Sequence, residues 1–535
     1  MTAAAAAAAA VTASLKRLDI GQFVVAGLLA EPPLVTRESP HPEGPSGGPI
    51  LGAILALDSD MDLKSSPSVG AARSLVLNQT GCPTYFSDSH PPLTAAQAAI
   101  EAERCYYCVD APCIAACPTA IDIPSFIARI AQDNLRGAAR AILEANPLGG
   151  LCARVCPTEV LCEQACVRNT LEDKPVEIGA LQRHATDAHF ADPGAPLFSR
   201  DAPTGKRVAV VGAGPAGLAC AHGLARRGHS VVLFDRQPKP GGLNEYGIAA
   251  YKVVDNYAQR EVDWLLSIGG IELRLGCSLG IDITLAELRD GFDAVFLGLG
   301  LGGVNALGID EPELEGLAAA VDFIAELRQA SDLSSVTVGR HVVVIGGGMT
   351  AVDAAVQSKL MGAQSATIVY RRGPESMSAS QVEQDWALTH GVVIRHWATP
   401  VRVLSADGRV NGVEFACTAL QEGRLVQTTE TFHLPADRVH RAIGQTYQPE
   451  AAGSSLRLTA GRIECDEHGR TNLQRVWAGG DCRHGGRDLS VEAVQHGKVA
   501  ADSIHAELDG EVFRDPGSLP HIMKAGATAP GARHG

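Results

Sequence analysis

The sequence predicts an α/β protein in which a helical, cysteine-rich domain precedes two Rossmann-like dinucleotide-binding domains. Two observations lead to this fold class. Eight of the 14 cysteines lie between Cys105 and Cys166. A plan of apolar strand, glycine turn, helix and strand occurs twice, at residues 207–235 and 341–371. Short Val/Ile-rich runs alternate with helix-length segments from Arg207 onward, which is typical of a parallel sheet built from βαβ units.

Length and composition narrow the class of protein. The chain has 535 residues, 46% of them apolar and 20% charged, which allows three or four domains at roughly 150 residues each. The formal net charge of −15 argues against a nucleic-acid partner, because phosphates attract basic patches. No apolar run approaches the ~18 residues of a membrane helix, and no basic residue precedes the alanine run Ala3–Ala10 as in a signal peptide. We expect a cytoplasmic protein that binds neither membrane nor nucleic acid.

The composition also predicts the domain limits. Residues 1–78 are rich in Ala, Pro, Gly and Ser without a sustained period, which predicts a disordered or low-complexity extension. Residues 79–195 hold the clustered cysteines among helical patterns such as Ile123–Ile130. The tail at 513–535 is rich in Pro, Gly and Ala and is expected to be loose.

The first glycine loop follows a short apolar strand and opens a helix. Gly212 allows the tight turn, Gly214 lets the backbone approach a pyrophosphate, and Gly217 lets helix and strand pack closely. The helix N-terminus then faces the phosphates. Asp235, at the end of the next strand, can accept hydrogen bonds from a ribose. The pattern predicts a bound dinucleotide rather than an unliganded turn.

Two later segments indicate that this dinucleotide is FAD. Gly242 and Leu243 belong to a second loop of close approach. Far downstream, a strand that ends in Gly480 and Asp481 precedes the helical stretch 491–501. This segment resembles the C-terminal flavin motif of flavoproteins related to the disulfide reductases, in which the acidic residue binds the ribityl chain. The alternative for Asp481 is an ordinary helix cap.

The second glycine loop predicts an NAD(P)H site. Its three loop positions are filled by Gly346, Gly348 and Ala351. With one extra loop residue allowed, Tyr370 falls where Asp235 fell, and Arg371 and Arg372 follow. An acidic residue there favours NAD, whereas an arginine can pair with a 2′-phosphate. The alternative is that both arginines form a solvated strand end.

The clustered cysteines form two quartets. These are Cys105, Cys108, Cys113 and Cys117, then Cys152, Cys156, Cys162 and Cys166. Closely spaced cysteines can reach neighbouring corners of an iron–sulfur cubane, and the fourth corner usually needs a remote ligand. Zinc is the main alternative, but zinc sites prefer paired C-x2-C knuckles and only one is present. The quartets predict two [4Fe–4S] clusters.

Together these sites predict an electron relay. A flavin accepts a two-electron hydride and releases electrons singly, whereas iron–sulfur clusters carry single electrons. No C-x-x-C motif lies near either glycine loop, so the flavin lacks the redox-active disulfide of thioredoxin- and glutathione-reductase-type enzymes. Cys220, alone in the helix of the first loop, is interpreted as a packed thiol.

Several specific runs carry a family resemblance. They are CYYCVDAPC at 105–113, PLGG at 147–150, CARVCPTE at 152–159, IGALQ at 178–182, AAVQS at 354–358 and YRRG at 370–373. With these runs, residues 77–508 resemble the glutamate synthase small-subunit family, and within it the NADH-oxidising subunits of bacterial dihydropyrimidine dehydrogenases. The resemblance implies an NAD(P)H domain at 336–440, inserted into an FAD domain at 200–335 and 441–512.

The resemblance also implies the cluster ligands. One cluster takes Cys105, Cys108, Cys113 and the remote Cys166. The other takes Cys117, Cys156, Cys162 and, unusually, Gln182, which leaves Cys152 as a spare packed thiol. Counting alone instead gives eight cysteine ligands, with Gln182 only packing its helix.

The implied function is that of an electron-input subunit. Hydride passes from nicotinamide to flavin, so no catalytic side chain is expected, and single electrons pass to a partner subunit with FMN and further clusters that reduces uracil or thymine. A glutamate synthase small subunit feeding a glutaminase-bearing large subunit is the alternative, although residues 379–385 look more like the pyrimidine branch. A zinc-bound interaction module on a flavoprotein scaffold is a more remote one. The arginines at 371 and 372 favour NADPH, but the similar bacterial subunits use NADH, and we expect NADH.

Overall fold

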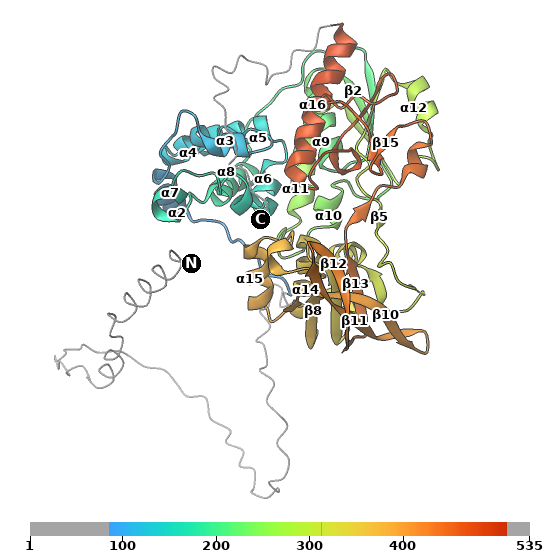
Figure 1. The fold of residues 1–535 in the computed structure, drawn as a ribbon. Coiled ribbons are helices and arrows are strands. Elements are labelled where there is room, and N and C mark those ends of the chain that lie inside the picture. Colours follow the sequence, from blue (N-terminus) through green and yellow to red (C-terminus); the bar gives the residue numbers. More distant parts are fainter. Residues whose placement is uncertain (1–84, 312, 511–535) are drawn as a thin grey trace, which may run out of the picture. The chain divides into compact units, whose positions relative to one another are not determined.

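The computed structural model describes residues 85–311 and 313–510. The extension expected at 1–78 and the tail expected at 513–535 lie outside these residues. The described chain forms a helical domain followed by two parallel sheets, each with its own helices (Figure 1). The predicted fold class is confirmed.

The described part of the cysteine-rich segment consists of helices joined by loops. Its elements are α2 (Ala95–Glu103), α3 (Pro112–Ala116), α4 (Ile123–Ala131), α5 (Leu135–Ala145), α6 (Gly149–Val155), the 3-10 turn η1 (Thr158–Val160), α7 (Asn169–Glu172) and α8 (Ile178–Ala191). Asp122 caps the N-terminus of helix α4, where its carboxylate accepts the Ser125 N–H. It buries apolar side chains at helical spacing, namely Ile123, Phe126, Ile127 and Ile130. The cysteine loops pack against this core.

The first dinucleotide fold is a parallel sheet with strand order β17-β4-β1-β2-β3. Its strands are β1 (Arg207–Val211), β2 (Ser230–Asp235), β3 (Ile271–Leu275), β4 (Ala294–Leu297) and β17 (Val476–Ala478). Its helices are α9 (Pro215–Arg226), α10 (Leu243–Tyr246), α11 (Tyr257–Leu266), α12 (Leu285–Gly291) and α16 (Ser490–Asp509). A Cβ on Gly497 would lie 2.1 Å from the Ala216 carbonyl oxygen, so α16 packs directly on α9. This packing brings the chain around Asp481 close to the first glycine loop.

The second dinucleotide fold is a parallel sheet with strand order β6-β13-β7-β8-β9. Its elements are β6 (Leu317–Ala319), α13 (Ala320–Gln329), β7 (His341–Gly346), α14 (Met349–Leu360), β8 (Ser365–Val369), α15 (Gln381–Thr389), β9 (Val393–Arg395) and β13 (Arg438–Ala442). An antiparallel sheet of β10 (Ala398–Ala406), β11 (Arg409–Gln421) and β12 (Arg424–Pro435) lies between β9 and β13 in the chain. All of these elements lie between β4 and β17, so the second fold is inserted into the first.

The two connections of the insert run side by side. They are the paired strands β5 (Gly303–Val304) and β14 (Gln445–Thr446). The remaining short elements are η2 (Leu333–Ser335), η3 (Pro374–Ser376), η4 (Pro449–Ala452), β15 (Leu458–Thr459), β16 (Arg462–Ile463) and η5 (Gly480–Cys482).

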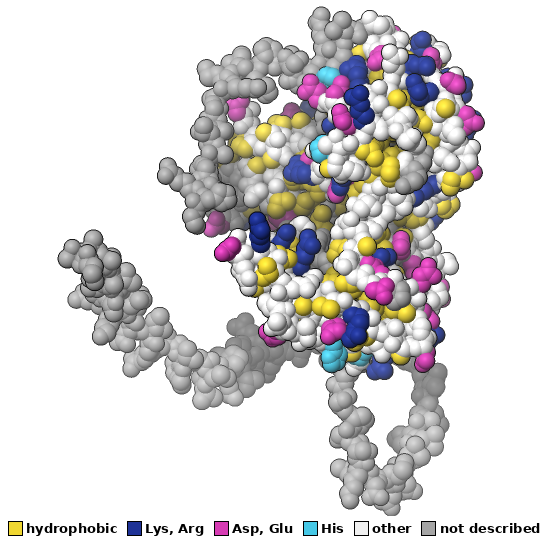
Figure 2. All heavy atoms as spheres, turned by 45° about the vertical axis from the view of Figure 1, so that its right-hand side comes forward, with side chains coloured by type: hydrophobic (Ala, Val, Ile, Leu, Met, Phe, Trp, Pro, Cys, Tyr) yellow, Lys and Arg dark blue, Asp and Glu magenta, His cyan; other side chains and the backbone are white. Residues whose placement is uncertain are grey.

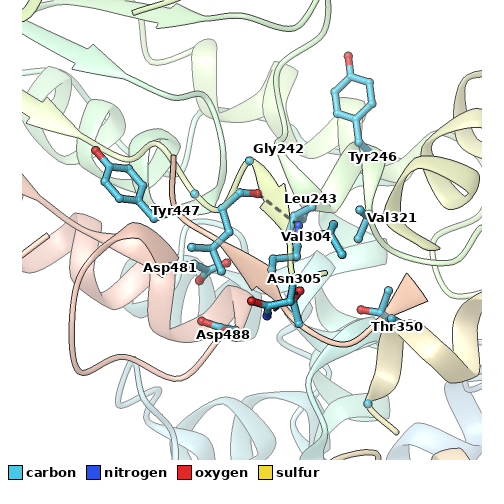
Figure 3. A pocket seen from close by; sticks show the side chains of 18 of the residues that line it. Gly242, Leu243, Tyr246, Val304, Asn305, Val321, Thr350, Tyr447, Asp481 and Asp488 are labelled. Carbon is cyan, nitrogen blue, oxygen red and sulfur yellow. Dashed lines mark hydrogen bonds between the residues drawn. The ribbon is translucent and has the colours of Figure 1, made fainter. Parts of the chain in front are cut away.

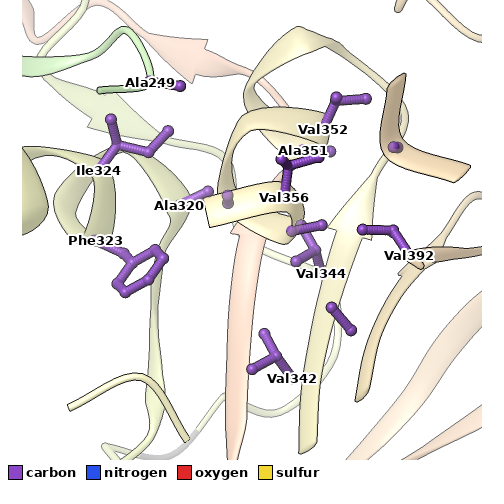
Figure 4. Close-up of a cluster of buried hydrophobic side chains, with 14 of the residues drawn as sticks. Ala249, Ala320, Phe323, Ile324, Val342, Val344, Ala351, Val352, Val356 and Val392 are labelled. Atoms are coloured by element: carbon purple, nitrogen blue, oxygen red, sulfur yellow. The ribbon is translucent and has the colours of Figure 1, made fainter. Parts of the chain in front are cut away.

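The start of the insert differs from the sequence expectation. The boundary was expected at residue 336, yet β6 pairs with β13 at the edge of the second sheet. Phe323 and Ile324 of α13 pack in one cluster with Val342 and Val344 of β7 (Figure 4). By sheet membership the insert therefore spans 317–442. The pairing of β6 with a strand about 120 residues later leaves no local signal in the sequence.

The surface carries charges of both signs. On the face shown in Figure 2, Lys and Arg side chains are interspersed with Asp and Glu. Within residues 85–311 and 313–510, no helix combines the length and hydropathy required to cross a membrane.

Candidate functional site

A cavity of about 1290 Å³ is lined by both glycine loops. The predicted residues in its wall are Gly212, Gly214, Asp235, Gly242, Leu243, Gly346, Gly348, Arg371, Gly480 and Asp481. In Figure 3, Asp481 and Asp488 lie on one side of it and Thr350 on the other, with Val304 and Asn305 of the connection between them. The carboxyl ends of parallel strands are where dinucleotides bind in such folds. Three predicted residues, Gly217, Ala351 and Arg372, are not in the wall.

The first glycine loop is held by backbone packing. Gly212 has a φ of +102°, and a Cβ on Gly217 would lie 1.8 Å from the Gly212 carbonyl oxygen. Gly217 therefore acts beneath the loop, where it lets α9 start against the turn. Gly242 approaches Gly214 so closely that a Cβ on it would lie 2.6 Å from the Gly214 Cα. The start of α9 has no side-chain cap of its own, which leaves its N–H groups free for an anionic ligand.

Asp235 braces this loop from the end of β2. Its Oδ2 accepts the Ala213 N–H at 2.6 Å, and its Oδ1 accepts the Gln237 N–H at 2.8 Å. Burial raises the pKa of Asp235 above its ordinary value. The carboxylate is half-buried in the cavity wall, so a ribose hydroxyl would share it with the loop backbone. Its contact with ribose stays a prediction.

The segment around Asp481 closes the cavity from the other end of the chain. Gly480 has a φ of +75°, and the next turns place Ser490 and Ala493 of α16 in the same wall. Burial, helped by the negative charge of Asp488, raises the pKa of Asp481 to about 6. A raised pKa means that the ionised form of Asp481 is disfavoured in this pocket. Hydrogen bonds from hydroxyl groups would stabilise that form, and a ribityl chain carries such hydroxyls.

The two arginines that follow β8 differ in their position relative to the cavity. Arg371 is exposed in the cavity wall, whereas Arg372 is exposed outside it. The Tyr370 ring covers Gly347, where a Cβ would lie 2.5 Å from the ring, and its hydroxyl donates to the Ser376 carbonyl at 2.5 Å. Ala351 is buried in α14, so it packs the helix against the sheet. Of the two arginines, only Arg371 is placed to contact a nucleotide in this cavity.

Four cysteines surround a second, small cavity. They are Cys105, Cys108, Cys113 and Cys166, the set that the resemblance assigns to one cluster. Burial, together with the neighbouring thiols of Cys105 and Cys166, raises the pKa of Cys113 to about 11. Bound iron would instead lower the pKa of these cysteines, because a coordinated thiol is deprotonated. In the described residues no three His, Cys, Asp or Glu side chains are grouped tightly enough to hold a single metal ion; these four thiols line the walls of a cavity instead.

The remaining cysteines of the two quartets form a second cysteine group, which consists of Cys117, Cys152, Cys156 and Cys162. A hydrogen bond with Cys152 raises the pKa of Cys156, and burial and the neighbouring Cys162 and Cys117 thiols raise it further. Cys152 is buried within α6. Gln182 is buried in α8 and donates from Nε2 to the Gly149 carbonyl at 2.6 Å, about one turn before Cys152. Both candidates for the fourth ligand therefore lie at the α6–α8 contact.

The cavity wall also contains a buried charged cluster that no sequence motif predicts. Lys252 Nζ lies 2.8 Å from Asp353 Oδ1 and 2.7 Å from Glu383 Oε1, and the Tyr251 hydroxyl donates to Asp353 at 2.8 Å. Burial opposes the charge of Lys252, but the two carboxylates outweigh it and raise its pKa. Lys252 and Asp353 line the cavity. The partners come from both dinucleotide folds, far apart in sequence, so no local motif marks them.

Two family models match the chain. Residues 83–193 match "Dihydroprymidine dehydrogenase domain II, 4Fe-4S cluster", and residues 206–497 match "Pyridine nucleotide-disulphide oxidoreductase". The first match covers the cysteine groups and the second covers the two glycine loops.

Curated relatives agree over most of their length. The NAD-dependent dihydropyrimidine dehydrogenase subunit PreT of Salmonella typhimurium is 33% identical over 426 residues, which cover 79% of this chain and 98% of the relative. The glutamate synthase (NADPH) small chain of Escherichia coli is 35% identical over 445 residues, covering 78% and 93%. The putative oxidoreductase UacF of E. coli is 36% identical over 453 residues, covering 80% and 70%. These matches confirm the resemblance, and the chain belongs to the family of PreT-type subunits and glutamate synthase small chains, which are NAD(P)H-dependent flavin and iron–sulfur oxidoreductases.

Proposed function

We propose that this chain is the electron-input subunit of a dihydropyrimidine dehydrogenase. It oxidises NAD(P)H via FAD and passes single electrons through two [4Fe–4S] clusters to a partner subunit that reduces uracil or thymine. One observation supports electron transfer from the dinucleotide site to the cysteine-rich domain. Val155, which directly precedes Cys156, lines the same cavity as both glycine loops. The cavity thus extends from the dinucleotide loops to the second cysteine group.

The residues divide the work by position. FAD supplies the conversion of a two-electron hydride into single electrons. Gly212, Gly214 and the start of α9 hold its pyrophosphate, and Asp481 accepts from its ribityl hydroxyls. Gly346, Gly348 and Arg371 bind NAD(P)H from the facing loop. Cys105, Cys108, Cys113 and Cys166 hold one cluster, and Cys117, Cys156, Cys162 and Gln182 hold the other.

A partner subunit is part of the proposal. The relatives are named as a subunit and a small chain. Beside Cys105 and Cys108, the side chains of Tyr106, Tyr107 and Val109 are 49%, 42% and 97% exposed. Such an apolar rim at a cluster site supports transfer to a second protein that covers it.

The glutamate synthase small subunit remains the second candidate, because that relative matches at 35% identity over nearly its whole length. The two candidates differ in the protein that binds this chain. Co-purification with a tagged chain separates them: an FMN-bearing pyrimidine-reducing subunit supports the first, and a glutaminase-bearing large subunit supports the second.

The isolated chain should oxidise NAD(P)H with an artificial electron acceptor and should not reduce uracil. The reason is that the described residues, 85–311 and 313–510, form the cysteine-rich domain and two dinucleotide folds, and none of these is a pyrimidine-binding domain. Anaerobic assays with uracil, with and without the FMN-bearing partner, check this. Robust uracil reduction by the chain alone would contradict the proposal.

We expect a larger kcat/KM for NADH than for NADPH. Arg371→Ala should lower kcat/KM for NADPH more than for NADH, since only a 2′-phosphate adds charge for the guanidinium. Arg372→Ala, outside the cavity wall, is the matched control and should change neither. Steady-state kinetics with both nucleotides test this. A tenfold preference for NADPH, about 1.4 kcal/mol of transition-state binding, would reverse the expectation.

A further inference from the structure

One buried carboxylate joins the FAD-binding fold to the second cysteine group. Glu261 lies on α11 and is 1% exposed. Its Oε1 accepts the backbone N–H groups of Gly150 at 2.8 Å and Leu151 at 3.1 Å, and its Oε2 lies 3.2 Å from the Leu151 nitrogen.

Helix α6 has no cap of its own. Its N-cap residue is Leu148, whose side chain makes no capping hydrogen bond, so the first N–H groups of the helix need an acceptor from elsewhere. Glu261 supplies it from a different domain, through carboxyl oxygens that accept the Gly150 and Leu151 N–H groups. The same helix carries Cys152, ends at Cys156 and presents Val155 to the cofactor cavity.

The contact is built for close approach. A Cβ on Gly150 would lie 1.8 Å from the Tyr257 hydroxyl and 3.0 Å from Glu261 Oε1, so a side chain there would push α6 away from α11. Arg154 makes further contacts around Gly150 and Tyr257. It donates to the Gly150 carbonyl at 2.8 Å, its guanidinium lies 3.4 Å from the centroid of the Tyr257 ring, and it pairs with Asp187 at 2.5 Å.

We propose that Glu261 is a positioning residue for electron transfer between the flavin site and the second cysteine group. By capping α6 from α11, it fixes the Cys156 sulfur relative to the FAD-binding fold. This rests on the proposed function. The two electrons of each hydride from NAD(P)H pass singly to the cluster at this group, and the proton leaves to solvent. Because electron tunnelling weakens steeply with distance, a small displacement of α6 slows this transfer and leaves the earlier hydride step intact.

Two variants disturb the contact from opposite sides. Glu261→Gln keeps the shape but turns an N–H donor toward the helix donors. Gly150→Ala forces α6 away from Tyr257. Glu287→Gln is the matched control, because Glu287 takes part in the capping box of α12, a seven-residue helix of the first dinucleotide fold that does not contact α6 through this residue.

The test is anaerobic stopped-flow mixing of the full holoprotein with NADH, following flavin reduction and cluster reduction separately, with FAD and iron content measured for each variant. Both variants should slow cluster reduction at least about tenfold, as misplacement of a reacting group does, while flavin reduction and cofactor content stay as in the parent. Electron paramagnetic resonance should show an altered magnetic interaction between flavin and cluster. The control should match the parent in both phases.

Unchanged cluster reduction in a variant that retains its iron would overturn the assignment, as would equal slowing of both phases. If one variant fails to fold, the other decides. Absence of cluster reduction in the parent protein would instead overturn the proposed function, so the two failures are distinguishable.

Discussion

Replacing Lys252 by methionine should destabilise the folded protein by about 3–5 kcal/mol, the usual effect of removing one member of a buried ion pair. Lys252 is 8% exposed and lies within hydrogen-bond distance of both Asp353 and Glu383. Its loss leaves two carboxylates and the Tyr251 hydroxyl in a pocket without a cation. The measurement is the thermal or urea unfolding transition of each protein. Hydrogen exchange of the amides in α14 and α15 then shows whether the stability is lost in the insert.

The destabilisation should depend on pH in a defined direction. Burial already raises the pKa of Glu383, and Lys252 opposes that rise. Without the lysine, the folded-state pKa rises further above the unfolded value. Protonated Glu383 then favours the folded state at low pH, and this contribution is lost as pH rises through the folded pKa. The deficit relative to the parent should therefore be larger at pH 8 than at pH 5.

Two further variants make this prediction sharp. Lys206→Met removes a lysine whose partner, Asp293, lies 3.8 Å away at the exposed surface, and it should cost less than about 1 kcal/mol. Adding Asp353→Asn and Glu383→Gln to Lys252→Met removes the unbalanced charge and should recover part of the stability. A Lys252→Met protein as stable as the Lys206→Met control at pH 8 would show that the cluster does not tie the two folds together.

The sequence predicted those parts of the site that depend on local spacing. Gly212, Gly217 and Gly346 recur at fixed offsets because turn, helix start and strand packing are local geometry. Cysteine spacing likewise marked the eight candidate ligands, whereas the grouping of Cys105, Cys108 and Cys113 with Cys166 around the small cavity was implied only by the family resemblance. Lys252, Glu261 and strand β6 left no such mark, because each acts through a partner that is distant in sequence. Asp353 and Glu383 lie about 100 and 130 residues from Lys252, and β6 pairs with a strand about 120 residues later.

The fold also sharpened one distinction that spacing could not draw. Arg371 and Arg372 are adjacent and alike in sequence, yet only Arg371 lines the cavity. Likewise Gly217 fits the motif of a phosphate loop but lies beneath it, against the Gly212 carbonyl. A sequence motif therefore predicts the path of the backbone. Which residues of the motif can contact a ligand depends on which of them face the cavity.

Cys152→Ala should keep about eight irons per chain, four for each of two [4Fe–4S] clusters, whereas Gln182→Ala should alter or lose one cluster. The expectation follows from the ligand set of Cys117, Cys156, Cys162 and Gln182. A glutamine is a neutral donor, so a cluster with this ligand set would carry one less negative charge than an all-cysteine one, and losing the donor would open a coordination site. Iron analysis and electron paramagnetic resonance of both variants measure the outcome.

The geometry makes this pair of substitutions informative, because both side chains meet the same helix contact. Cys152 is buried in α6, and its carbonyl accepts the Cys156 N–H, while Gln182 reaches α6 from α8 through the Gly149 carbonyl. For Gln182 to ligate iron, its carboxamide oxygen must face the cluster while Nε2 keeps this hydrogen bond, which orients the amide. Gln182→Glu keeps an oxygen donor but removes the N–H, so it should retain the cluster with a changed spectrum. If Cys152→Ala loses a cluster and Gln182→Ala leaves both spectra unchanged, the ligands are the eight cysteines and Gln182 only packs α8 against α6.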